Sequence, residues 1–295
     1  MTFIELDSNS LASKVVPLLD TLSDEDRQRV ITCIRVPCPR VLLTRTASRA
    51  QHLPVQCREA NYRGEQGNCR RMNTRPFRFN LFGTDYTLDI EDEDTSECVA
   101  AEIVEGRSYP IYDWMRDEPV RPIQSIVDVG ANVGVFSFVF GQLFPDATIY
   151  AYEPDAETFD VLTRNIAGRK AWCHRVAVSD SSGKACLYMN SVGGSLMRTI
   201  RACDGSVHSE VETVDANVAL PERVDILKLD IEGMEMPVLR SIADRLSDIP
   251  YIYTEYHTEE DRLQMDMLLL PTHRLWYSRG QHPDLGETLY VRRKA

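Results

Sequence analysis

The chain has 295 residues, enough for one large α/β domain with an appended region, and its formal net charge is −12. Hydrophobic residues make up 43% of the sequence and charged residues 26%, which is typical of a globular protein. Acids stand near the N-terminus where an export signal would carry positive charge, and no apolar run approaches the ~18 residues of a membrane span. We therefore expect a cytoplasmic protein without a membrane segment.

The first predicted region, residues 1–76, is an extension rich in arginine. Apolar spacing over Leu11–Ile34 predicts helices, and residues 35–75 predict an irregular connection. Residues 27–78 contain twelve Arg and no Lys against two acids. Such a stretch can bind a polyanion, but it has no regular aromatic residues and no nucleic-acid motif. We expect it to pair with the acidic remainder or to form a partner interface, as in a homo-oligomer, and we do not expect nucleic acid as a partner.

The second predicted region, residues 77–124, leads into the core. Residues 77–82 and 86–90 alternate with period two around a Gly-Thr-Asp turn, which predicts a β-hairpin. Cys98–Asp113 then predicts a helix and a turn that carry Glu102 and Tyr109. Both side chains are candidates to cover a ligand site, or simply to cap the core.

The third predicted region, residues 125–295, begins with the run SIVDVGANVGVF. Residues 126–129 predict a buried parallel strand, Gly130–Gly134 a tight turn, and residues 133–144 a packed helix. A strand, a glycine turn and a helix N-terminus present free backbone N–H groups to an anionic ligand. About twenty residues later a second apolar strand ends at Glu153, whose carboxylate can bind the two hydroxyls of a ribose. The pair of motifs predicts a nucleoside-type cofactor.

The turn also indicates which cofactor to expect. It lacks the middle glycine of the dinucleotide motif, and no phosphate-binding loop of the G-x-x-x-x-G-K type is present. A turn filled by Ala131 and Asn132, with Asp128 near the end of the preceding strand, suits a smaller zwitterion. The amino acid part of S-adenosylmethionine is one: its carboxylate can meet the helix N–H groups and its ammonium can meet Asp128.

The following elements alternate between strands and helices. In chain order we expect a helix at 155–166, a strand at 172–178, a polar loop at 193–201 that is a candidate substrate lid, a strand at 224–230 with a helix after it, a strand at 251–255, a helix at 259–270, and a hairpin of 273–278 with 288–292. This order predicts an α/β three-layer domain with an antiparallel end pair.

Four segments carry a resemblance to a known family: VDVGANVG, the YEP that ends the second strand, AVSDSSG, and above all LKLDIEGMEMPVLRS. From about Ser125 to His257 the chain resembles the FkbM-type S-adenosylmethionine-dependent methyltransferases. The resemblance implies a class I methyltransferase fold, which is a Rossmann-like three-layer sandwich with a mostly parallel sheet and an antiparallel C-terminal strand. It also implies O-methylation of a sugar, glycan or natural product, as in secondary metabolism. The cofactor-binding residues it implies, together with the turn, are Asp128, Gly130, Ala131, Asn132, Gly134, Glu153, Pro154, Ala177, Val178, Asp230, Glu102 and Tyr109.

The catalytic candidates follow the carboxyl ends of two later strands. Methyl transfer to a hydroxyl needs an aligned acceptor and a group that takes its proton. His257, with an ordinary pKa near ~6.5, can accept a proton at neutral pH. We expect Asp230 to orient the acceptor or the sulfonium end of the cofactor, and Glu232 to serve the same site.

Three other interpretations stay open. The oxygen-rich set Asp230, Glu232, Glu235 and Glu255 would suit Mg²⁺ in a metal-assisted variant, although we assign no metal ligands. A cofactor-binding regulatory module without turnover is a second interpretation, and a nucleic-acid methyltransferase is a third. The eight cysteines contain no C-x-x-C pair, and we expect free thiols.

Overall fold

The computed structural model describes residues 56–57, 72–117, 119–192, 195–201, 209–282 and 284–293. The predicted helices at 11–34, most of the arginine-rich stretch and Gly193-Gly194 lie outside these residues. The described residues belong to one unit of the chain, Arg49–Ala295. The division at residues 76 and 124 stays a prediction.

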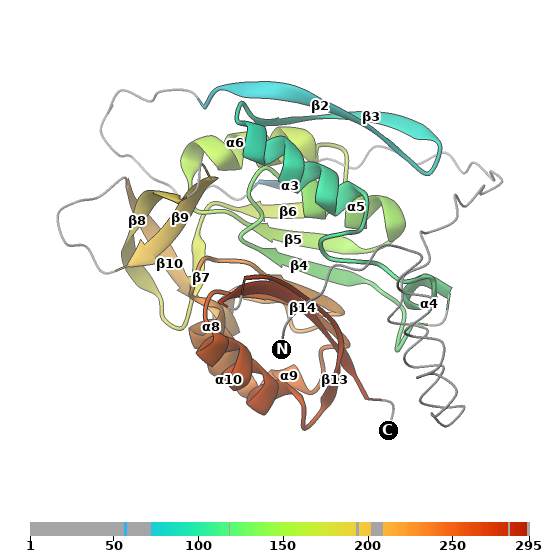
Figure 1. Cartoon of the computed structure of the whole chain (residues 1–295), viewed down its shortest axis with the longest axis vertical. Coiled ribbons are helices and arrows are strands. Elements are labelled where there is room, and N and C mark those ends of the chain that lie inside the picture. The colour runs from blue at the N-terminus through green and yellow to red at the C-terminus, as the bar shows by residue number, and fades with distance from the viewer. Residues whose placement is uncertain are drawn as a thin grey trace, which may run out of the picture. The chain divides into compact units, whose positions relative to one another are not determined.

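A central sheet of eight strands organises the described residues (Figure 1). Its strands, from one edge to the other, are β1 (Gln56–Cys57), β6 (Ala171–His174), β5 (Thr148–Tyr152), β4 (Ser125–Val129), β11 (Ile226–Leu229), β12 (Tyr251–Tyr256), β14 (Leu285–Arg292) and β13 (His273–His282). Neighbours from β1 to β12 are parallel, whereas β14 runs antiparallel to both β12 and β13. The predicted parallel sheet with an antiparallel end is therefore confirmed.

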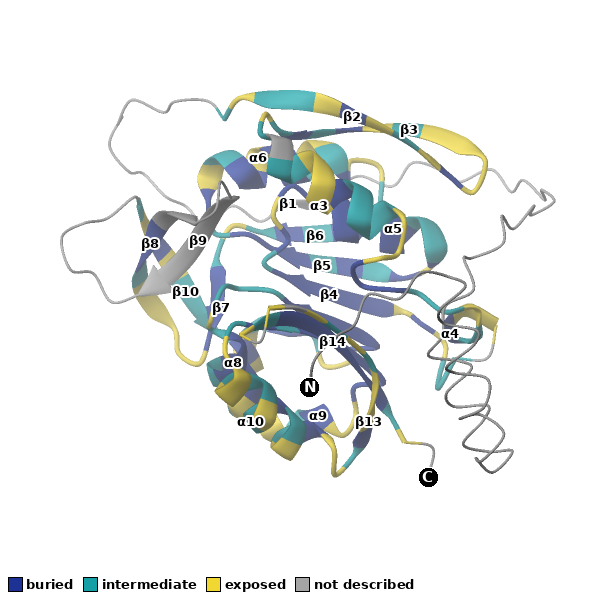
Figure 2. Ribbon diagram, in the orientation of Figure 1, coloured by how far each residue is buried: buried dark blue, intermediate teal, exposed yellow. Residues whose placement is uncertain are grey.

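Helices cover both faces of this sheet (Figure 1). One layer contains α3 (Asp94–Val104), α5 (Val135–Leu143) and α6 (Ala156–Asn165); the other contains α8 (Glu235–Ser241), α9 (Ala243–Leu246) and α10 (Glu259–Leu269). Every residue of β4 is buried, because its side chains alternate between the two layers. Ile126 packs with Phe136 and Phe140 of α5, while Val127 shares the opposite core with Leu239 of α8. In Figure 2 the buried residues concentrate in the central strands.

Local sequence signals account for the helix starts in both layers. The Asp155 carboxylate accepts the N–H of Thr158 at 3.0 Å and caps α6. Thr258 caps α10 in the same way, through the N–H of Asp261 at 3.0 Å. Helix α5 instead begins after Gly134, which has no side chain to act as a cap. The N–H groups in the first turn of this helix are therefore available to another acceptor.

Two smaller sheets flank the core. The predicted hairpin is present as β2 (Thr74–Leu81) and β3 (Thr84–Glu91), and it lies over the α3–α6 layer (Figure 1). A four-stranded sheet has the order β7–β10–β8–β9; its strands are β7 (Ala177–Ser179), β10 (Ser209–Asp215), β8 (Gly183–Val192) and β9 (Ser195–Arg201). Short helices α4 (Asp113–Asp117) and α7 (Ala216–Ala219) complete the described elements.

The small sheet differs from two sequence predictions. The single strand expected at 172–178 is divided, because β6 pairs with β5 whereas β7 leaves the central sheet to pair with β10. The predicted lid is a strand at 195–201, paired with β8. Cys98 and Cys173 form no disulfide bond, as expected, but Cys186 in β8 does, so the prediction of free thiols is wrong there. None of the helices in the described part of the chain is both long and apolar enough to cross a membrane.

Candidate active site

A cavity of about 440 Å³ opens at the carboxyl ends of β4, β5, β11 and β12. This is where ligands bind in open α/β sheets. The structure brings most of the predicted site residues to its wall: Glu102, Tyr109, Gly130, Ala131, Asn132, Glu153, Pro154, Ala177, Val178, Asp230, Glu232 and His257. Two predicted residues, Asp128 and Gly134, are not part of the lining.

The glycine turn is held against two neighbouring strands. The N–H groups of Gly130 and Ala131 both donate to the carbonyl of Tyr152, at 3.1 and 2.9 Å. Gly130 has φ 76°, and a Cβ atom at this position would lie 1.8 Å from the carbonyl oxygen of Asp230. At Gly134, with φ 87°, a Cβ atom would lie 2.6 Å from Leu162. At both positions glycine is required because the backbone has positive φ and a neighbouring group leaves no room for a Cβ atom.

Glu153 at the end of β5 is fixed beside this turn. Its Oε2 atom accepts the N–H of Asn132 at 3.0 Å, and its Oε1 atom accepts the N–H of Asp155 at 2.9 Å. The residue is 6% exposed and lines the cavity. Two backbone N–H groups therefore fix the orientation of this carboxylate at the cavity wall.

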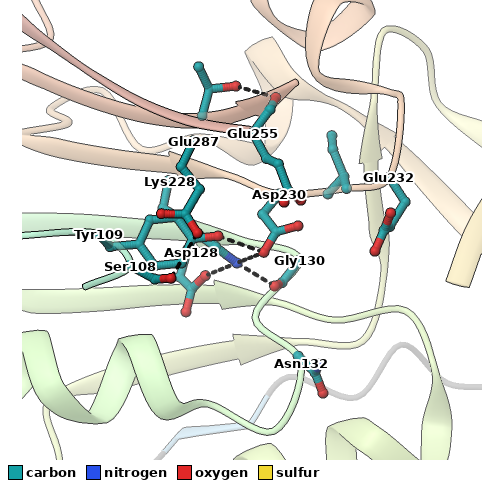
Figure 3. Close-up of polar contacts among 12 residues, drawn as sticks. Ser108, Tyr109, Asp128, Gly130, Asn132, Lys228, Asp230, Glu232, Glu255 and Glu287 are labelled. Atoms are coloured by element: carbon teal, nitrogen blue, oxygen red, sulfur yellow. Dashed lines mark hydrogen bonds and ion pairs between the residues drawn. The ribbon is translucent and has the colours of Figure 1, made fainter. Parts of the chain in front are cut away.

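Sequence reasoning missed the centre of the polar network, Lys228. This lysine lies in the middle of β11 and is 3% exposed. Its Nζ atom donates to the carbonyl of Gly130 at 2.6 Å and lies 3.2 Å from Asp128 and 3.4 Å from Asp230 (Figure 3). Burial alone would lower the pKa of Lys228, but the two carboxylates raise that pKa above its ordinary value. The available signal was a lysine inside an apolar strand that ends in an acid.

Asp128 lies beneath the cavity. It is completely buried, and its second oxygen accepts a hydrogen bond of 2.7 Å from the hydroxyl of Ser137. Since Lys228 occupies the other oxygen, the carboxylate supports the turn from below. The predicted contact of Asp128 with a cofactor ammonium therefore finds no support in the position of this side chain.

Asp230 has three polar partners at the end of β11, namely Lys228, Tyr109 and the carboxyl group of Glu255. Besides Lys228, the Tyr109 hydroxyl donates to its Oδ2 atom at 2.8 Å (Figure 3). Burial alone would raise the pKa of the Asp230 carboxyl, but the Lys228 charge and these hydrogen bonds hold it below its ordinary value. Asp230 is therefore ionised at neutral pH, and with 28% of its side chain exposed it faces the cavity.

His257 lies among three glutamates after β12. Its Nε2 atom is 3.2 Å from Glu232, 3.7 Å from Glu255 and 3.9 Å from Glu235. Burial lowers the pKa of His257, which keeps the imidazole neutral at pH 7. Burial, with the charges of Asp230 and Glu235, raises the pKa of Glu232 to about 8. Burial and the Asp230 charge raise the pKa of Glu255 well above its usual range.

Glu102, one of the two predicted covering residues, takes part in a second network. Glu102 accepts two hydrogen bonds from the Arg279 guanidinium, at 2.9 and 3.0 Å. Ser108 donates to Glu287 of β14 at 2.8 Å. These contacts attach the segment after α3 to the antiparallel hairpin, so Glu102 holds the cavity wall in place.

Backbone strain also concentrates at the cavity. The described non-glycine residues with positive φ are Phe82, Tyr109, Asn132 and Glu232, and the last three line the cavity. A left-handed conformation is costly for such residues and persists where surrounding contacts fix it. The surrounding contacts therefore hold the backbone of these three residues in a fixed conformation.

The central strand order β6–β5–β4–β11–β12–β14–β13, with β14 antiparallel, defines a class I methyltransferase fold. Residues 128–277 match the family described as methyltransferase FkbM domain. The chain therefore belongs to the FkbM methyltransferase family, and the expected resemblance is confirmed.

Three curated relatives show how far the similarity extends. Methyltransferase sdnD of Sordaria araneosa is 31% identical over 40% of this chain and 60% of its own length. Hexuronic acid methyltransferase AglP of Haloferax volcanii is 27% identical over 48% of this chain and 59% of its own length. The 2-O-methyltransferase NoeI of Sinorhizobium fredii is 26% identical over 48% of this chain and 66% of its own length. The chain thus spans about 60% of the length of these relatives.

Proposed function

We propose that this protein transfers a methyl group from S-adenosylmethionine to a hydroxyl group of a sugar, glycan or other small molecule. The observation that carries the proposal is one cavity whose wall includes both Glu153, beside the glycine turn, and His257, beyond β12. The first part of the cavity, around Glu153 and the glycine turn, has the features that a nucleoside cofactor needs. The second part of the cavity, around His257, has the polar groups that a hydroxyl acceptor needs.

The residues of the first part fit the cofactor. Glu153 would accept hydrogen bonds from the ribose hydroxyls, since two backbone N–H groups hold its carboxylate at the cavity wall. Helix α5 starts without a side-chain cap, and its first residues line the cavity, which suits the carboxylate of the amino acid part. Pro154, Ala177 and Val178 would contact the base, and Tyr109 would close the cavity from above. Asp128 supports the turn through Lys228.

The residues of the second part fit an acceptor hydroxyl. When bound, S-adenosylmethionine supplies a methyl group activated by a sulfonium, and the electron pair of the broken carbon–sulfur bond stays on sulfur. His257, Asp230 and Glu232 then orient the acceptor oxygen and receive its proton as the new carbon–oxygen bond forms. Asp230 is the member of this set that is ionised at neutral pH.

The names of two relatives support hydroxylated acceptors. One is called a hexuronic acid methyltransferase and another a 2-O-methyltransferase. We therefore favour a carbohydrate acceptor, with natural products of secondary metabolism as the related class and the cytoplasm as the place of reaction. A regulatory module without turnover is not favoured, because the acceptor part of the cavity keeps its polar side chains.

Calorimetry with S-adenosylhomocysteine is the first experiment. We expect one binding site per chain, and a matched control variant, D160N on the exposed face of α6, should bind equally well. A panel of neutral sugars, uronic acids and hydroxylated natural products is then assayed for formation of S-adenosylhomocysteine. Absence of cofactor binding by the folded protein would overturn the proposal.

A further inference from the structure

Two glutamates and a histidine converge at one point of the cavity wall. Glu232 comes from the turn after β11, while Glu255 and His257 come from the end of β12. One ligand atom from each of these three side chains lies within 4.8 Å of the other two. A cation placed among the three atoms would therefore touch all of them after small side-chain movements.

The cluster is unusual because polar atoms of two of its members, His257 and Glu232, have no hydrogen-bond partner among the described residues. Both ring nitrogens of His257 and the Oε2 atom of Glu232 are buried and have no hydrogen-bond partner among the described residues. A buried imidazole is a polar group that normally has a hydrogen bond or a ligand. Here its nearest polar neighbours are carboxylate oxygens, between 3.2 and 3.9 Å from Nε2.

Among the described residues, the basic side chains bonded to the wall of this cavity already have other partners. Lys228 is occupied by Asp128, Asp230 and the Gly130 carbonyl. Arg279, on the antiparallel hairpin, is paired with Glu102 of the cavity wall. The cluster therefore combines two carboxyl groups and an imidazole, the donor types of a cation site, with no cationic partner among the described residues.

The turn that carries Glu232 is built to hold this side chain in place. Glu232 has φ 56°, a strained conformation for a non-glycine residue. Glu235, which is 2% exposed, secures the turn by accepting the N–H groups of Ile231 at 2.8 Å and Gly233 at 2.9 Å. Supporting contacts of this kind orient the ligands of metal sites.

We propose that Glu232, Glu255 and His257 bind a divalent cation, which holds the acceptor oxygen during methyl transfer. This deepens the proposed function and rests on it. Three protein ligands leave coordination positions open for substrate, and a mixed oxygen–imidazole set suits a cation such as Mn²⁺. A hydroxyl bound to the cation loses its proton more readily. That proton would pass to the carboxylate of Asp230, which lines the same cavity.

Manganese binding tests the site without requiring turnover. The full chain is freed of metal with EDTA, dialysed, and titrated with Mn²⁺ while the electron paramagnetic resonance signal of free Mn²⁺ is followed. We expect about one bound ion per chain. E255Q and H257A should each weaken binding by about 10–100-fold or more. The control E93Q, at a glutamate of the same cavity on the connection before α3, should bind like wild type.

The outcomes separate this inference from the proposed function. Binding of S-adenosylhomocysteine in EDTA tests the cofactor part alone, and it also shows that each variant is folded. Turnover should be lost in EDTA and restored by Mn²⁺. The cation site is overturned if wild type leaves the Mn²⁺ signal unchanged, or if E255Q and H257A bind Mn²⁺ as wild type does. Either result leaves cofactor binding, and hence the methyltransferase proposal, unaffected.

Discussion

The Nζ atom of Lys228 lies 3.2 Å from the Oδ1 atom of Asp128, and neither side chain is more than 4% exposed. The two residues face each other across the β4–β11 pair, because they are partners in its register. The same ammonium donates to the carbonyl of Gly130. One buried cation therefore joins two central strands to the turn that we assign to the cofactor.

Replacing Lys228 by methionine tests this relationship. The side chain keeps its approximate length, but Asp128 loses its counter-charge in a site without access to water. Breaking a buried pair from one side costs about 3–5 kcal/mol, and we expect K228M to lose this much free energy of unfolding in urea denaturation. The exposed K170M should change it by less than about 0.5 kcal/mol. Adding D128N to K228M should recover part of the loss, and a K228M protein as stable as K170M would contradict the argument.

The parts of the site that the sequence predicted are those encoded by contiguous residues. The turn at Gly130–Gly134 follows its own strand directly, and Glu153 ends the adjacent strand, so one short-range pattern placed each of them. Their contact through the N–H of Asn132 then follows from the parallel pairing of β4 with β5. Packing on both faces made those strands recognisable as apolar runs.

The parts that the sequence did not predict depend on distant partners. Lys228 meets an acid one hundred residues earlier in the chain, and only the register of β11 with β4 shows this. The same holds for β7, whose local sequence continues β6 but whose pairing partner, β10, is more than thirty residues away. In both cases tertiary pairing decides the environment, and the local pattern does not identify the pairing partner.

Glu153 should determine cofactor affinity. In E153Q the side chain keeps its shape but loses the charge that strengthens hydrogen bonds to hydroxyl groups. Hydrogen bonds to charged groups contribute about 1.5–3 kcal/mol, so we expect the dissociation constant of S-adenosylhomocysteine to rise by about 10–100-fold. Calorimetry measures the change, with D160N as the matched control. An affinity equal to that of wild type would remove Glu153 from the cofactor site.

Stability should fall as the pH rises through the neutral range. The pKa values of Glu232 and Glu235 are raised to about 8 and about 7, so both carboxyls keep their protons in the folded chain at pH values where the unfolded chain has lost them. Where the folded state binds more protons, the free energy of unfolding decreases with pH, by about 1.4 kcal/mol per unit for each such proton.

Urea denaturation in EDTA between pH 5 and pH 8 measures this decrease, the upper limit being set by the pKa of about 8 for Glu232. Glutamine cannot titrate, so E232Q should show a shallower decrease and become more stable than wild type toward pH 8. A control variant, E260Q on the exposed side of α10, should follow wild type. Parallel curves for E232Q and wild type would show that Glu232 titrates as an ordinary surface carboxyl.

Asp230 should matter for turnover more than for folding or cofactor binding. In D230N the Tyr109 hydroxyl keeps an oxygen to bond, and Lys228 keeps Asp128 as its counter-ion, so the turn at Gly130 remains supported. The amide, however, cannot receive the acceptor proton. Loss of such a group costs about 10²–10⁴-fold in rate, and we expect kcat/KM to fall by this factor while S-adenosylhomocysteine still binds. Because the pKa of Asp230 lies below its ordinary value, wild-type activity should show no loss from its protonation near neutral pH. A decrease of less than about threefold in folded D230N would move proton transfer to His257 or Glu232, the other two groups at this end of the cavity.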